Sequence, residues 1–109
     1  MAAALRKRAR AQRDLVEHYV YLAEHAGFET ADRFLQDAEK SFADLCQHPG
    51  MGTALTLRSP KLAGLRKWQV SEFENVLIFY LAEGERISIV RVLHAARDWW
   101  SLLGIDFTP

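Results

Sequence analysis

The chain has 109 residues, 50% of them hydrophobic and 26% charged, which excludes a disordered chain and fits a single folded domain over residues 1–109. Lys and Arg together number 14, and so do Asp and Glu, so the formal net charge is zero. Sequence-independent binding to DNA or RNA depends on neutralising phosphates, and we therefore expect no direct nucleic-acid contact.

Cysteine usage and hydropathy predict a cytoplasmic protein. The single cysteine, Cys46, excludes a disulfide within the chain and fits a reducing compartment. Its neighbours Phe42, Leu45 and Pro49 predict a buried structural thiol. Residues 1–8 lack the apolar stretch of a secretion signal, and no apolar run approaches the ~20 residues of a membrane span, so no membrane contact is expected.

A short edge strand and a helix are expected first. Residues 5–9 alternate apolar and basic side chains, a weak edge-strand pattern. Apolar residues then recur at three- and four-residue steps, which predicts a helix over 11–26. Gly27 is placed to end this helix in the left-handed conformation. The apolar stripe consists of Leu15, Tyr19, Leu22 and Ala26, widened by Val16, Val20 and Ala23.

A second amphipathic helix is expected after Glu29. Thr30 is the predicted cap of its start, and Pro49 ends it because proline disfavours helix at the residue before it. The short link between the two helices predicts an antiparallel hairpin. The stripe of the second helix consists of Ala31, Phe34, Leu35, Ala38, Phe42 and Leu45.

The second half of the chain changes to a period of two. Residues 49–60 are predicted to be irregular, and 65–70 to be a half-buried strand. Residues 76–81 are apolar on both faces, which predicts a central strand, and 87–94 form the last strand. A short helix is expected over 97–103. The turns between the strands are expected at 74–75 and 83–85.

This order of elements defines the expected fold class, an α+β domain with the order β-α-α-β-β-β and a short C-terminal helix. Tight turns force neighbouring strands to be antiparallel. The helical hairpin must bury its apolar stripe, so it is expected to pack on one face of a small antiparallel sheet.

Three segments, in this order, carry a family pattern. The first ends the second helix and includes Leu45, Pro49, Met51 and Gly52. The second consists of Leu65 and Arg66 followed by Phe73, Asn75, Ile78, Phe79 and Tyr80. The third runs from Ile89 to Asp98 and contains Arg91, His94 and Arg97. The ordered set resembles the ParE toxins of the RelE/ParE superfamily over nearly the whole chain.

The resemblance implies the β-α-α-β-β-β fold and a toxin of a type II toxin–antitoxin system that arrests bacterial growth. ParE-like members of the superfamily inhibit DNA gyrase by protein–protein contact, whereas RelE-like members cut messenger RNA on the ribosome. A small antitoxin neutralises either branch, and a ParD-like protein of the ribbon-helix-helix type is expected here. A third alternative is a non-toxic interaction module that retains antitoxin binding.

The nuclease alternative would use Arg66, His94 and Arg97, by resemblance to RelE-like sites. Cleavage of RNA needs a base, a proton donor and cations at one phosphate. No lysine cluster accompanies these residues and no tyrosine follows Tyr80. We therefore favour a protein with no catalytic residues of its own. His94, Arg97 and Asp98 are then interpreted as polar groups that support the fold after the last strand.

Aromatic and apolar residues supply the expected contacts with an antitoxin or target. Adjacent tryptophans point in different directions, so one of Trp99 and Trp100 is expected to pack on the sheet and the other to face a groove or a partner. The candidate contact residues are Leu15, Tyr19, Trp99, Trp100, Leu102 and Leu103. No cofactor is expected, and no metal site, because His18, His25 and His48 lack companions at helical ligand spacing.

Overall fold

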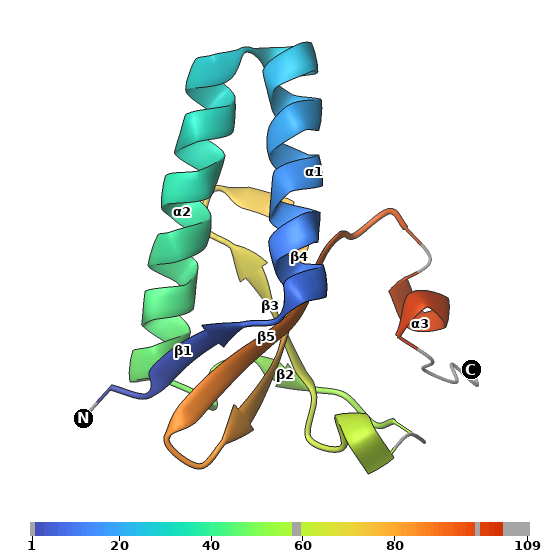
Figure 1. Ribbon diagram of the computed structural model, residues 1–109. Coiled ribbons are helices and arrows are strands. Elements are labelled where there is room, and N and C mark those ends of the chain that lie inside the picture. The colour runs from blue at the N-terminus through green and yellow to red at the C-terminus, as the bar shows by residue number, and fades with distance from the viewer. Residues whose placement is uncertain (1, 58–59, 98, 104–109) are drawn as a thin grey trace.

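A helical hairpin covers one face of a five-stranded sheet in the computed structural model, which describes residues 2–57, 60–97 and 99–103 (Figure 1). The helices are α1 (Ala9–Ala26), α2 (Phe28–Gln47) and the short α3 (Trp99–Leu102), with a 3-10 turn at Pro60–Leu62. The strands are β1 (Ala4–Lys7), β2 (Thr53–Ala54), β3 (Arg66–Val70), β4 (Phe73–Glu83) and β5 (Arg86–His94). The predicted α+β class is confirmed, and the predicted elements occur in the predicted order. Residues 49–60 were predicted to be irregular, and this prediction is wrong for β2, which lies within them.

The strand order in the sheet is β1-β5-β4-β3-β2. The pairs β3–β4 and β4–β5 are antiparallel, as predicted. The short strand β2, which was not predicted, also pairs antiparallel with β3. β1 differs, because it pairs in parallel with β5 and places Leu5 opposite Ile87. The parallel pair arises because the helical hairpin and three strands separate β1 from β5 along the chain. β4 lies at the centre of the sheet, which its two apolar faces predicted.

Gly27 alone connects the two long helices. Its φ of 91° is positive, as predicted, while its ψ of 161° is extended. A glycine reverses the chain here within one residue, so α2 begins at Phe28 and Thr30 lies inside the helix. The prediction that Thr30 caps α2 is therefore wrong. Over the described residues, neither long helix is apolar enough to cross a membrane.

The turn between β3 and β4 lies earlier than predicted. It occupies Ser71 and Glu72, and Glu72 has a φ of 64°, which few residues other than glycine adopt. A register shift between Gln69 and Val70 accompanies it, so β4 begins at Phe73 instead of 76. The turn before β5 lies where it was predicted, with Gly84 at a φ of 63°.

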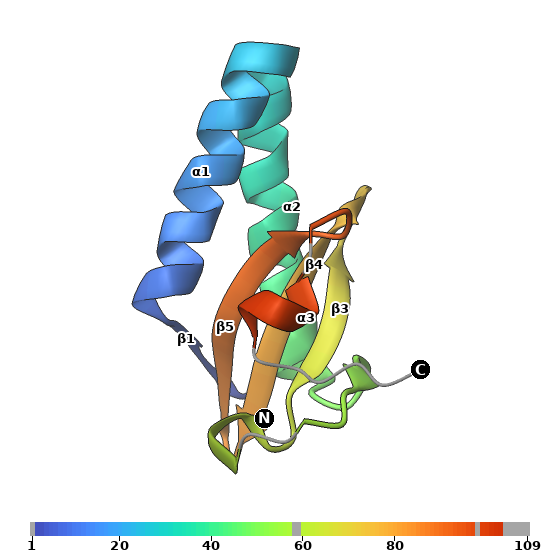
Figure 2. The same cartoon turned by 90° about the vertical axis from the view of Figure 1, so that its right-hand side faces the viewer.

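Both faces of the sheet are buried. The hairpin packs on one face, and α3 lies on the other, as Figure 2 shows. The first core contains Phe34, Phe42 and Tyr80, and it also holds Cys46, which is 8% exposed, so the predicted buried thiol is confirmed. The second core contains Phe79 and Trp99, whose ring centroids lie 5.3 Å apart.

Candidate functional site

A buried ion pair joins α1 to β5. The carboxylate of Asp14 accepts hydrogen bonds from Nε of Arg91 at 2.8 Å and from Nη2 at 3.1 Å. Asp14 is 2% exposed and Arg91 9%. Arg91 belongs to the family pattern, but sequence reasoning missed Asp14. The available signal was its place beside Leu15 and three residues after Ala11, on the face of α1 that is buried.

Side chains of α1 also close the edge of β5 where β1 has ended. The backbone N–H of Arg8 donates to the carbonyl of Ile89 at 3.0 Å. Beyond that point, Asp14 Oδ2 accepts the N–H of Val92 at 2.9 Å, and Nε2 of His18 donates to the Val92 carbonyl at 2.9 Å. Beyond the end of β1, side chains of α1 thus bond the backbone groups of β5 that would otherwise be exposed at a sheet edge.

Residues from the first two segments of the family pattern meet in one cluster, which we call the loop clasp. Tyr80 Oη donates to the carbonyl of Pro49 at 2.8 Å and accepts the N–H of Gly52 at 3.0 Å. Nη1 of Arg66 donates to the carbonyls of Gly52 at 2.7 Å and Gly50 at 3.3 Å. The clasp fixes the segment after α2 against β3 and β4, so these pattern residues have a structural role.

The clasp explains why a glycine stands at position 52. A Cβ at Gly52 would lie 2.5 Å from Tyr80 Oη and 2.9 Å from the carbonyl oxygen of Lys67. Burial raises the pKa of the Tyr80 phenol, while the Gly52 N–H and the charge of Arg66 act in the opposite direction. The clasp therefore holds a neutral phenol. Two further pattern residues, Leu65 and Phe79, are fully buried in the second core.

The three nuclease candidates are not assembled into one site. Arg66 pairs with Tyr80, and His94 pairs with Val76. Tyr80 and Val76 are four residues apart on β4, which places the two backbones roughly 13 Å apart along the strand. The Arg66 guanidinium is also occupied by the loop clasp. Arg66 and His94 therefore cannot act on the same phosphate in this arrangement.

His94 and Arg97 do line one pocket, of about 390 Å³, together with residues of α1 that sequence reasoning missed: Glu17, His18 and Tyr21. Nδ1 of His94 accepts the backbone N–H of Ala96 at 3.0 Å, so the neutral ring carries its hydrogen on Nε2. The Arg97 side chain is exposed, and its backbone N–H donates to the His94 carbonyl at 3.0 Å. Arg97 thus supports the turn through its backbone. Asp98 lies outside the described residues.

The candidate contact residues near the C-terminus divide into two pairs. Trp99 and Leu103 are 8% and 7% exposed and belong to the second core, which removes them from the free surface. Trp100 and Leu102 are 38% and 43% exposed. One tryptophan therefore packs on the sheet and the other faces outward, as the sequence predicted.

The candidate contact residues of α1 are less available than predicted. Leu15 is buried in the first core, because the helix turns this residue towards the sheet. Tyr19 Oη donates to Asp32 Oδ1 of α2 at 3.0 Å, and this bond is the main reason that the pKa of Tyr19 is raised. The exposed apolar and aromatic residues of α1 are instead Val16, Val20 and Tyr21, which are 62%, 47% and 60% exposed. Val16 and Val20, four residues apart, lie on one face of the helix.

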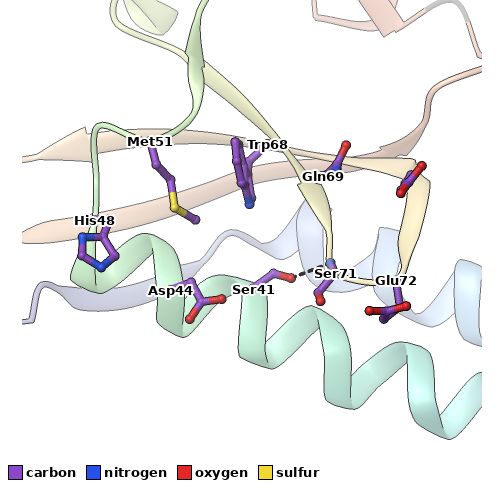
Figure 3. Close-up of a pocket in the computed structure, with 9 residues that line it drawn as sticks. Ser41, Asp44, His48, Met51, Trp68, Gln69, Ser71 and Glu72 are labelled. Atoms are coloured by element: carbon purple, nitrogen blue, oxygen red, sulfur yellow. Dashed lines mark hydrogen bonds between the residues drawn. The ribbon is translucent and has the colours of Figure 1, made fainter.

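A further pocket, of about 490 Å³, lies between α2 and the edge of β3 (Figure 3). Its lining residues are Ser41 and Asp44 of α2, His48 and Met51 of the segment that follows α2, Trp68 and Gln69 of β3, Ser71 and Glu72 of the next turn, and Glu74 of β4. We call it the edge pocket. Within the described ranges, no group of three or more His, Cys, Asp or Glu side chains is arranged to hold a metal ion, here or elsewhere.

The fold and the family pattern together define a small two-layer toxin domain. The family model of the ParE toxin of the type II toxin–antitoxin system parDE matches residues 5–99. The chain belongs to this family. No curated protein matches it by sequence.

Two solved structures resemble the fold. One is the chromosomal ParDE toxin–antitoxin system of P. aeruginosa, with a TM-score of 0.69 and 22% identity over 85% of this chain and 96% of that one. The other is the RelBE2 toxin–antitoxin complex of Mycobacterium tuberculosis, with a TM-score of 0.59 and 22% identity over 89% of this chain and 95% of that one. At this identity the likeness establishes the fold, which both branches of the superfamily share.

Proposed function

We propose that this toxin inhibits DNA gyrase in the cytoplasm by protein–protein contact and carries no catalytic residues of its own. The separation of Arg66 from His94, roughly 13 Å along β4, is the observation that carries the proposal. A nuclease must bring cation, base and proton donor to one phosphodiester. Arginine stays protonated and cannot replace the missing base, so a site built on Arg66 alone would lack acid–base catalysis.

Contact with gyrase is assigned to the outward side of α3. Trp100 and Leu102 are exposed there, while Trp99 and Leu103 anchor the short helix on the sheet. A large aromatic ring on an anchored element loses little conformational entropy on binding, and such residues dominate interface energies.

A ParD-like antitoxin of the ribbon-helix-helix type is the proposed neutralising partner. Both structural neighbours come from toxin–antitoxin systems. On this chain, Val16 and Val20 form an apolar strip on the outward face of α1, in contact with solvent. Burying such a strip under a partner gains free energy in proportion to the apolar area removed from water.

Gyrase supercoiling in the presence of the purified toxin tests the target. We expect inhibition, and we expect Trp100→Ala to weaken it about 10- to 30-fold, the effect of losing one interface anchor. Phe28→Ala is the matched control, because Phe28 is also exposed but begins α2 directly after Gly27. The turn between α1 and α2 lies at the opposite end of the hairpin from the sheet edge next to α3 in Figure 1. Equal inhibition by Trp100→Ala and wild type would show that Trp100 of α3 does not contribute to the contact with gyrase.

Growth after expression in bacteria separates a toxin from a non-toxic module. We expect arrest with this chain alone, and recovery when the protein encoded by the neighbouring reading frame is co-expressed. Unimpaired growth at confirmed soluble expression would instead identify an interaction module that has the same fold and is not toxic.

A RelE-like ribosome-dependent endoribonuclease is the second candidate. The observation that favours it is the pocket in which His94, Arg97 and Tyr21 lie together. Cleavage of ribosome-bound messages at codon positions, lost in both Arg66→Ala and His94→Ala while gyrase stays active, would establish this function in place of gyrase inhibition.

A further inference from the structure

The edge of β3 is open for part of its length. β2 pairs with β3 at two positions, and just before them the N–H of Leu55 donates to the Leu65 carbonyl at 2.9 Å. Backbone groups alternate between the two sides of a strand, so the N–H and C=O of Gln69 point to the same edge as those of Leu65 and Lys67. β2 does not reach this point, and no described group bonds the Gln69 backbone on that side.

The next backbone group along this edge is already satisfied. The N–H of Ser71 donates to Ser41 Oγ of α2 at 2.9 Å, and Figure 3 shows this bond at the rim of the edge pocket. The gap at Gln69 therefore lies between β2 on one side and α2 on the other. The gap adjoins the edge pocket, because Gln69 is one of the residues that line it.

The chemistry of the edge pocket selects a cationic side chain. Trp68 is half-buried, and Figure 3 shows its ring and the Met51 side chain directed towards Ser41 and Asp44 of α2. The carboxylates in the lining belong to Asp44, Glu72 and Glu74. In the described part of the chain, none of the three forms an ion pair. An indole face next to unpaired carboxylates attracts cations, and a guanidinium ion best of all, because it is planar and donates in a fork.

We propose that an extended segment of the antitoxin lies along this gap, bonds the Gln69 backbone and inserts an arginine side chain into the edge pocket. The identity of the partner rests on the proposed function, whereas the extended shape and the positive charge come from the open edge and the pocket. This contact is separate from the apolar strip on α1. A segment that adds to a sheet edge binds through its main chain and is selected through its side-chain pockets.

A small probe tests the pocket without any antitoxin. The purified chain is titrated with N-acetyl-arginine methylamide and with its neutral analogue N-acetyl-citrulline methylamide, while the indole N–H signal of Trp68 is followed by NMR. Trp68→Phe identifies the signal. We expect the chemical shift of this signal to change when the arginine compound is added and not when the citrulline compound is added. In the triple variant Asp44→Asn/Glu72→Gln/Glu74→Gln, the arginine compound should cause no change. Equal shifts with both compounds, or shifts retained in the triple variant, would overturn the cation site.

The antitoxin itself tests the partner. We expect the triple variant to bind the purified antitoxin about 10-fold more weakly at low salt, and less so at high salt. A variant with Glu29→Gln, Glu39→Gln and Glu85→Gln has the same change in charge away from both the pocket and the apolar strip on α1, and should bind like wild type. Gln69→Pro removes the unpaired N–H while leaving the β4 side of the strand intact, and should also weaken binding.

Wild-type affinity in both the triple variant and Gln69→Pro would refute the contact. The gyrase assay would be unaffected by that result, so the inference and the proposed function fail separately. If Gln69→Pro does not fold, which circular dichroism shows, the triple variant and its charge-matched control decide the outcome.

Discussion

Asp14 and Arg91, 77 residues apart in sequence, form a two-pronged ion pair with both side chains almost fully buried. The same carboxylate accepts the N–H of Val92, so one side chain fixes both the arginine and the strand backbone next to it. A buried charge without its partner is strongly unfavourable, because it has lost its hydration. The pair therefore ties α1 to β5.

Removing one member of this pair should be costly. We expect Asp14→Ala or Arg91→Met to lower the free energy of unfolding by about 3–5 kcal/mol, and the double variant to lose less than the sum. Urea denaturation measures this. Glu39→Gln breaks the exposed pair with Lys7 and is the control, with an expected loss below about 1 kcal/mol. A loss as small as the control's in Asp14→Ala would mean that the buried pair contributes little.

Gly52 should tolerate no side chain. A Cβ at this position would clash with Tyr80 Oη and with the Lys67 carbonyl, so Gly52→Ala should destabilise the fold by about 1–3 kcal/mol. Gly50→Ala is the matched control, because a Cβ there meets nothing within 4 Å. The melting temperatures of the two variants give the comparison. Similar values would show that the loop clasp can move aside.

Alkaline pH should weaken the fold through Tyr80. Burial raises the pKa of this phenol, so the unfolded chain ionises first, at about pH 10. The stability from the neutral phenol is complete below that pH and is lost as pH rises towards the folded value. Urea unfolding between pH 8 and 11 should show this loss, and Tyr80→Phe should show less of it.

Tyr19 is the necessary comparison, because its pKa is also raised, mainly by its bond to Asp32. Tyr19→Phe should keep most of the alkaline loss that Tyr80 causes. At pH 7, Tyr80→Phe should be less stable than wild type, since it lacks the bonds to Pro49 and Gly52. An unchanged alkaline slope in Tyr80→Phe would assign the effect to another group.

The apolar strip on α1 should matter for neutralisation and little for folding. Val16→Asp/Val20→Asp places two charges where an antitoxin would bury methyl groups, so affinity should fall at least about 10-fold. Stability should change by no more than about 1 kcal/mol, because both residues are exposed. Phe28→Asp, at another exposed apolar position, is the control. Full neutralisation of the double variant would place the antitoxin elsewhere.

The spacing of apolar residues was sufficient to predict the two long helices, the strands β3, β4 and β5 and their order, since burial imposes periods of 3.6 and 2. It did not predict β2, whose two residues are exposed and carry no such pattern. It failed where a single residue sets the backbone: Gly27 reverses the chain before Thr30, and Glu72 adopts a positive φ that no pattern signals. It also failed for Asp14, whose partner Arg91 is brought close by the tertiary fold alone.

The candidate sites were harder to predict than the fold. The edge pocket combines α2, β3 and the following turn, which are separate in sequence, so no local pattern indicates it. The family pattern includes Arg66 and Tyr80, and both lie in the loop clasp. Their bonds to backbone carbonyls, which give them a structural role, depend on the path of the loop at 49–52.

The parallel pairing of β1 with β5 also constrains when the domain can be completed. β1 is synthesised well before its sheet neighbour β5, and Asp14 of α1 can pair with Arg91 only after β5 has been made. Contacts of such long sequence separation form late. A nascent chain can therefore form the helical hairpin early, but the complete sheet and the surfaces built on it form only after β5 has left the ribosome.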